Sequence, residues 1–144
     1  MLEIRPYIPS DYIDIKRRHF DALAALNFPK PWAMARNLAT GRAFTMTYGE
    51  IVACGGILPL WKRVGEGWLV TSKLADQHKI ALGKAAWRII AQLFVEMDLE
   101  RLQTMVDAEH SVSLYWLERM GFKPEGRMPK YMGGRDFIRL ALVR

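Results

Sequence analysis

The sequence has few of the residues that define disulfide-linked, metal-binding or membrane-spanning proteins. Its one cysteine, Cys54, excludes an internal disulfide and a cysteine-based metal cluster, and it fits a reducing compartment such as the cytoplasm. The three histidines, His19, His78 and His110, are isolated and form no metal-ligand spacing. No apolar run approaches the roughly 20 residues of a membrane span, and the first residues lack the apolar core of a secretory signal.

What the chain does have is an excess of positive charge, +6 over 144 residues. Such a balance fits either nucleic-acid binding or a pocket for an acidic small molecule. The basic residues are scattered, apart from the run Lys16–Arg18, which we expect on the solvated face of a helix. No nucleic-acid motif accompanies them, so the charge favours the small molecule. The length predicts one domain over residues 1–144.

Hydrophobic patterning predicts an α/β fold in the order β-α-α-β-β-β-α-β-α-β-β. Hairpin-linked strands followed by β-α-β units imply a mixed sheet of about six or seven strands, flanked by about four helices on both faces. The expected strands are residues 2–7, 42–48, 51–58, 68–72, 102–106, 122–127 and 135–142, and the expected helices are residues 10–26, 32–38, 82–97 and 111–120.

Glycine and serine mark several expected turns and helix ends. Gly49 predicts a hairpin turn and Gly133–Gly134 another, whereas Gly121 is typical of the residue that follows a helix. Gly55–Gly56 lies inside a strand and predicts either a bulge or a close backbone approach. Ser10 is the expected N-cap of the first helix.

The segment His78–Ala85 follows the apolar run Trp68–Thr71 and predicts a loop that opens a helix. The N-terminus of a helix directs free N–H groups and a positive dipole end toward whatever lies before it. This arrangement favours a phosphate or pyrophosphate site.

Two motifs, in this order of elements, resemble the GNAT superfamily of acetyl-CoA-dependent N-acetyltransferases. Leu114–Gly126 is similar to the helix and "GF" segment that closes most members, and Tyr48–Ala53 is similar to the hairpin between their second and third strands. The resemblance covers essentially the whole chain. It implies a single GNAT-like acyltransferase domain, acetyl-CoA as co-substrate, and an amine acceptor that is either a small molecule or a protein.

The resemblance also implies the residues that would bind acetyl-CoA. Members carry Gln or Arg, two residues, Gly, one residue and then Gly or Ala at the helix opening; with Gly83 aligned, this chain has His78 and Ala81 at the first two positions. The fourth strand would pair with the pantetheine arm through its backbone. The implied set is Val70, Thr71, Ser72, His78, Lys79, Ala81, Leu82, Gly83 and Lys84.

Catalytic residues depart from the usual pattern. The Tyr that many members place four residues before the "GF" glycine is Leu117 here, and an Asn eleven residues before it is His110. His110 is either a candidate acid or base, because its ordinary pKa lies near neutrality, or a residue that opens the helix near Ser111 and has no catalytic role. Glu66 is a candidate base, or else a solvated turn residue, and Tyr115 is a candidate acid only if its helix is rotated.

These departures leave a second interpretation open. The pattern also resembles short GNAT-like proteins of tailed phages, which implies a catalytically degenerate virion or host-interaction protein, in the host cytoplasm or the virion. A nucleic-acid-binding module is a third interpretation and rests on charge alone. A homodimer is compatible with each.

Overall fold

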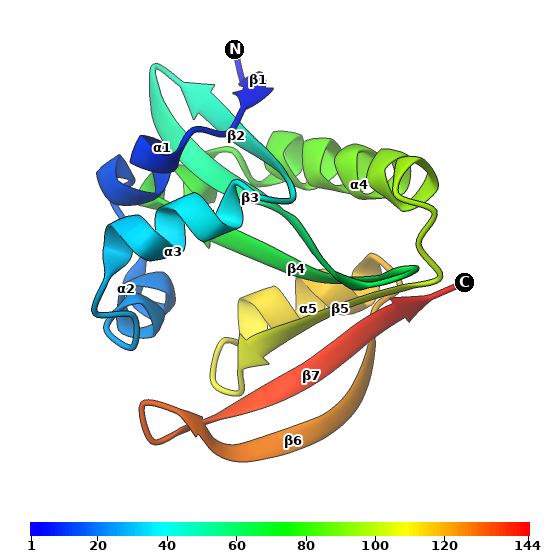
Figure 1. Ribbon diagram of the computed structural model, residues 1–144. Helices are drawn as coiled ribbons and strands as arrows, with labels where there is room; N and C mark the ends of the chain where they lie inside the picture. The colour runs from blue at the N-terminus through cyan, green and yellow to red at the C-terminus, as the bar shows by residue number, and fades with distance from the viewer.

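A seven-stranded mixed β-sheet with helices on both faces forms the centre of the computed structural model, which describes residues 1–144 (Figure 1). In chain order the elements are β1 Glu3–Pro6, α1 Pro9–Asp14, α2 His19–Ala25, α3 Pro31–Leu38, β2 Arg42–Tyr48, β3 Glu50–Trp61, β4 Val64–Thr71, a 3₁₀ helix Lys73–Gln77, α4 Lys79–Glu96, β5 Arg101–Asp107, α5 Ser111–Arg119, β6 Lys123–Met132 and β7 Arg135–Val143. The predicted fold class is confirmed.

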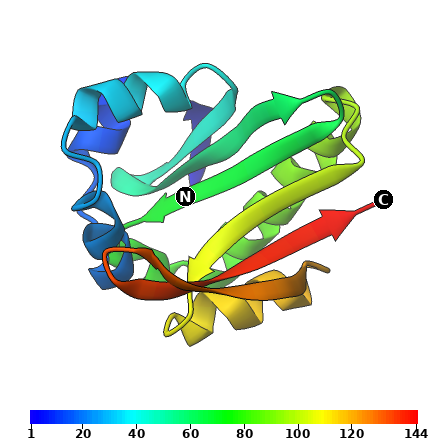
Figure 2. The ribbon, with the colours of Figure 1, turned by 60° about the horizontal axis from the view of Figure 1, so that its bottom comes forward.

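The sheet has the strand order β1-β2-β3-β4-β5-β7-β6, and every neighbouring pair is antiparallel except β4 and β5. β4 and β5 run parallel and share a ladder only where Val64–Glu66 faces Arg101–Gln103. Beyond Glu66 the two strands diverge, so the middle of the sheet opens as a V (Figure 2).

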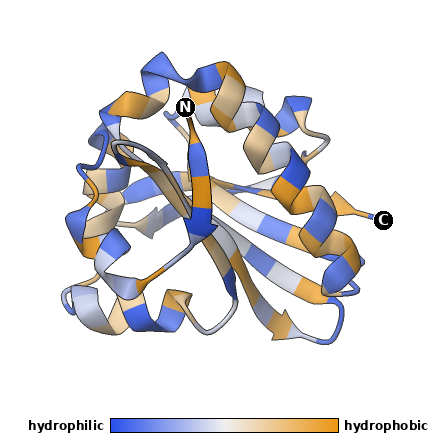
Figure 3. Cartoon of the chain, turned by 90° about the horizontal axis from the view of Figure 1, so that it is seen from above, coloured by the Kyte–Doolittle hydropathy of each residue, from blue (hydrophilic) through white to orange (hydrophobic).

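Hydrophilic and hydrophobic residues alternate along several strands (Figure 3). Because successive side chains of a strand point to opposite faces, neighbouring residues pack on different sides of the sheet. Cys54 packs with buried residues of α1 and α3, whereas its neighbour Ala53 packs with Leu82 of α4. A larger cluster joins Leu93 and other residues of α4 to β5 and β7, with α5 packed against it. Helices α1 and α3 therefore cover one face of the sheet, and α4 and α5 the other.

The first predicted helix, residues 10–26, is wrong as a single element. It is split into α1 and α2, because Ile15 takes an extended conformation and Arg17 forms an isolated β-bridge with Ser72 at the end of β4. The N-cap is Ile8 rather than Ser10. Pro9 occupies the first turn, and the Asp11 carboxylate accepts the Ile8 N–H at 3.0 Å.

Several strand ends and one additional element also differ from the prediction. β4 begins at Val64, so that Glu66 lies in a strand and not in a turn. The 3₁₀ helix Lys73–Gln77 separates β4 from α4, which the sequence pattern does not show. β6 continues to Met132 instead of ending near residue 127.

The turns predicted at glycines are confirmed, and the structure decides between a bulge and a close backbone approach at Gly55–Gly56. Gly49, Gly121, Gly133 and Gly134 have positive φ angles, as their turns require. The register runs without interruption through Gly55–Gly56, which excludes a bulge there. The close approach is confirmed, since a Cβ at Gly55 would lie 2.8 Å from the Trp68 carbonyl oxygen.

Candidate functional site

The opening between β4 and β5 holds a cavity of about 640 Å³ with mainly apolar walls. It reaches from the start of α4 and α5 on one face to α2 and the β6–β7 hairpin on the other. Its lining includes Phe20, Leu69, Leu82, Met105, Trp116 and Phe137. A cavity of this size, with a few polar groups among apolar ones, is the usual form of a ligand site.

The edge of β4 gives this cavity its backbone donors and acceptors. Ser72 N–H donates to Val52 O at 2.9 Å, so the backbone groups of Ser72 face β3, and by alternation those of Val70 do as well. The backbone groups of Leu69 and Thr71 face the opening instead. Of the predicted backbone contacts Val70, Thr71 and Ser72, only Thr71 therefore presents its backbone groups to the opening, and Leu69, which is outside the predicted set, does so as well.

Both backbone groups of Thr71 already have partners. The Asp21 carboxylate accepts Thr71 N–H at 2.9 Å and the Thr71 hydroxyl at 2.7 Å. Arg18 N–H donates to Thr71 O at 3.0 Å. The sequence pattern had placed Arg18 on a solvated helix face, which is wrong: the guanidinium is three-quarters buried and donates to Thr71 Oγ1 and to Asp76.

The start of α4 lies at the edge of the cavity. The first intrahelical hydrogen bond joins Leu82 N–H to His78 O at 2.8 Å, so the amides of residues 79–81 precede the helical ladder and are available to an anion. Lys79 and Leu82 line the cavity, whereas Ala81 and Lys84 are exposed. The His78 ring packs against Tyr48, with a centroid distance of 4.4 Å.

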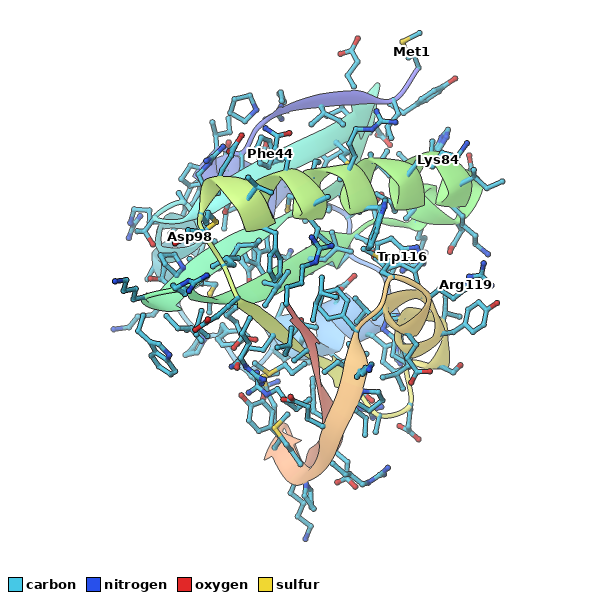
Figure 4. All side chains as sticks on the ribbon, turned by 90° about the vertical axis from the view of Figure 1, so that its right-hand side faces the viewer. Met1, Phe44, Lys84, Asp98, Trp116 and Arg119 are labelled. Carbon is cyan, nitrogen blue, oxygen red and sulfur yellow. The ribbon has the colours of Figure 1, made fainter.

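Gly83 serves the packing of α4 on α5. A Cβ at this position would lie 3.1 Å from Trp116 Nε1, and Figure 4 shows Trp116 between the two helices. The resemblance implies that Gly83 belongs to the acetyl-CoA set. In the structure the space beside its Cα is next to an indole ring of the protein itself.

His110 lies where β5 leads into α5, and its ring lines the cavity. The ring stacks on Phe20, with a centroid distance of 4.4 Å and an interplanar angle of 14°, and its Nε2 lies 3.1 Å from Ser113 Oγ. Burial lowers the pKa of the imidazole below its usual value, which the charge of Asp21 only partly opposes. A neutral imidazole near pH 7 can accept a proton.

The two other candidate catalytic residues have protein partners. The Glu66 carboxylate lies where β4 and β5 begin to diverge, 3.2 Å from both Arg139 Nη1 and Gln103 Nε2. Tyr115 is exposed at the cavity rim, and its hydroxyl accepts a hydrogen bond from Arg119 at 3.2 Å. Leu117 packs against the core cluster.

Solved structures with the same arrangement include acetyltransferases of the GNAT family. A GNAT-family acetyltransferase from Bacillus anthracis superposes with a TM-score of 0.73 at 17% identity, over 99% of this chain and 94% of that one. A GNAT-family acetyltransferase from Elizabethkingia anophelis with acetyl-CoA bound superposes with a TM-score of 0.70 at 16% identity, over 99% of this chain and 98% of that one. Mutant forms of the spermidine/spermine N-acetyltransferase SpeG from Vibrio cholerae superpose with a TM-score of 0.72 at 13% identity, over 99% of this chain and 95% of that one.

The chain has the GNAT fold. No protein-family model matches the sequence. No curated protein matches it either. At these identities the shared property is the fold. None of the helices of this GNAT-fold chain has the length and apolar character to cross a membrane.

Proposed function

We propose that this protein is an N-acetyltransferase that transfers an acetyl group from acetyl-CoA to an amine. The observation that carries the proposal is the opening between β4 and β5, with the start of α4 at one end and His110 in its wall. The acetyl-CoA-bound structure from Elizabethkingia anophelis, which shares the fold, supports it. A cytoplasmic location, which the single reduced cysteine favours, is consistent with this substrate.

The residues around the opening fit the acyl donor in chemical type. The amides of residues 79–81 and the Lys79 ammonium suit a pyrophosphate, although Ala81 and His78 stand where the family motif has Gly and Gln or Arg. The edge of β4 at Leu69 suits the amides of a pantetheine arm, because an extended ligand can pair with a free strand edge. The apolar cavity excludes water from a thioester.

His110 is the proposed general base and acid. Acetyl-CoA supplies an activated acyl group when it is bound. The neutral His110 ring accepts the proton that the amine loses as the new N–C bond forms and the thioester C–S bond breaks. His110 then gives this proton to the thiolate, or to the hydroxide that forms when water protonates the thiolate, and either transfer returns the ring to its neutral form. Glu66 and Tyr115, the candidate base and acid of the sequence pattern, already have protein partners, and we assign them the positioning of the amine and the thiol.

The amine would approach through the part of the cavity next to α2 and the β6–β7 hairpin. These two segments meet where the Asn27 side chain lies against Gly133. Phe20 and Ala24 of α2 and Met132 and Phe137 of the hairpin line this part, so it offers mainly apolar contacts.

Calorimetric titration of acetyl-CoA tests the proposal. We expect micromolar binding to the wild type and at least tenfold weaker binding to Lys79→Glu, because this lysine lines the cavity at the start of α4. Lys62→Glu, in the exposed turn between β3 and β4, is the matched control and should bind like the wild type. Absence of binding by the wild type at 1 mM acetyl-CoA would contradict the proposal.

A second candidate function is a non-catalytic GNAT-fold protein, for example a virion or host-interaction component of a phage. The occupied backbone groups of Thr71 favour it, because they leave less of the β4 edge for a ligand. Leu117 also favours the non-catalytic candidate, because its side chain has no proton to donate to the thiolate. This candidate predicts a folded protein that gives no heat of binding in the same titration.

A further inference from the structure

The segment Arg17–Asp21, which we name the α2 strap, crosses the open end of the V. We propose that the α2 strap competes with the acyl donor for Thr71 and thereby lowers the affinity of the cleft. The inference rests on the proposed function, because the competing ligand is acetyl-CoA. Asp21 is the residue that decides the competition.

At β4 the α2 strap behaves like a short added strand. Arg17 forms a β-bridge with Ser72, and Arg18 N–H donates to Thr71 O at 3.0 Å. The Asp21 carboxylate then takes the remaining edge group, Thr71 N–H, at 2.9 Å, together with the Thr71 hydroxyl at 2.7 Å. A ligand amide at this point of the edge needs the same N–H and C=O.

On the other side of the V the α2 strap rests on α5 and β7. Phe20 stacks on His110, and the Arg135 guanidinium lies 5.8 Å from the centre of the Phe20 ring. Both diverging halves of the sheet are therefore tied to one short segment. Release of the α2 strap would free Thr71 and at the same time uncover one face of His110.

The α2 strap is suited to release because polar contacts, which water can replace, make most of its attachments. α2 contains no buried residue, and the strap is held by hydrogen bonds, the Arg18–Asp76 ion pair, one β-bridge and ring contacts rather than core packing. Segments with few buried apolar contacts open locally at low free energy. The carboxylate of Asp21 can return to water, and the ligand amide can take its place on Thr71.

Substitution of Asp21 tests the competition. Asp21→Ala removes the acceptor from Thr71 N–H, and we expect it to bind acetyl-CoA at least fivefold more tightly than the wild type by calorimetry. Asp21→Asn, whose amide oxygen can still accept that N–H, should fall between the two. Asp14→Asn is the control, because it removes a carboxylate from an exposed position of α1. It should bind like the wild type.

A second measurement uses the unmodified protein. Trypsin cleaves after Arg17 and Arg18, and saturating acetyl-CoA should increase cleavage there at least threefold if the ligand displaces the α2 strap. Equal or weaker binding by Asp21→Ala, or protection of these bonds by the ligand, would overturn the competition and leave the proposed function intact. Absence of binding by the wild type and Asp21→Ala alike would overturn both.

Discussion

His110 shows how one residue acquires a role from its surroundings. In the sequence it is an isolated histidine at the start of a helix, with catalytic and structural interpretations equally open. In the structure it lines the cavity, stacks on Phe20 and is partly removed from water. The lowered pKa follows from that burial, because the charged imidazolium loses more solvation than the neutral ring.

Replacement of His110 tests its role as a base. We expect His110→Ala to lower kcat/KM by about 10²–10⁴-fold, which is the usual contribution of a general base. In the wild type kcat/KM should rise with pH through an apparent pKa below about 6.5, since the neutral ring is the active form. The variant should lose that ascending limb. An unchanged pH profile in the variant would assign the proton transfer to another group.

Asp11 is a residue whose surroundings determine its contribution to the stability of the fold. Burial would raise the pKa of its carboxyl, but hydrogen bonds from Arg5, Ile8 N–H and Thr45 outweigh it and lower the pKa. We expect Asp11→Ala to cost about 2–4 kcal/mol of unfolding free energy in urea, because three donors lose a buried acceptor. Lys16→Ala, which breaks only an exposed pair with Glu50, should cost less than about 0.5 kcal/mol.

The sign of the pH dependence follows from the lowered pKa of Asp11. The Asp11 carboxyl binds its proton more tightly in the unfolded state than in the native state. The stability that Asp11 contributes is therefore fully present at pH values above the ordinary carboxyl pKa of about 3.8. It is lost as pH falls through the lower native pKa. Stability of Asp11→Ala that declines as steeply as the wild type below pH 4 would contradict this account.

At the scale of helices and strands, the sequence predicts what depends on local patterning. The apolar stripe of α4, which includes Leu82 and Leu93, is long and regular, and the helix that it predicts is found in the structure. The break between α1 and α2 was missed because Ile15 and Phe20 continue a helical spacing across it. What stops the helix is a bridge to Ser72, and a partner so distant in the chain leaves no local signal.

The contact between α4 and α5 gives a prediction at the same scale. Gly83→Leu should cost about 1–3 kcal/mol of unfolding free energy in urea, because its side chain would displace Trp116. Ala81→Leu lies on the exposed side of the same helix and should change stability by less than about 0.5 kcal/mol. Equal effects of the two substitutions would show that α4 and α5 tolerate separation. A bulky residue at 83 therefore reports on folding as well as on ligand binding.

At the scale of the whole molecule, the resemblance anticipated the sheet and a free backbone edge on the fourth strand. It did not anticipate what faces that edge, because this depends on contacts such as Asp21 with Thr71 between segments far apart in the chain. The backbone groups of Val70 and Ser72 face β3 for a simpler reason. Alternation directs every second residue of β4 to β3, and the residue pattern does not reveal the register.

Acetyl-CoA should stabilise the whole fold if it binds as proposed. At 100 times its dissociation constant, a ligand adds about 2.7 kcal/mol, which corresponds to a rise in Tm of about 5–10 °C for a chain of this size. Thermal unfolding followed by circular dichroism measures the rise. Lys79→Glu should show a smaller rise at the same concentration, and an unchanged Tm of the wild type would contradict binding.

The short ladder between β4 and β5 also affects how the protein unfolds. Only Val64–Glu66 and Arg101–Gln103 join the two parts of the sheet, whereas β5 and β7 are paired throughout Arg101–Asp107. The other links are the α2 strap, the packing of Ile57 of β3 against β5 and β7, and α4, which contributes Leu82 to one core cluster and Leu93 to another. We therefore expect strands β1–β4 and β5–β7 to open as two foldons that share a helix, and their backbone amides to exchange with deuterium as two kinetic classes.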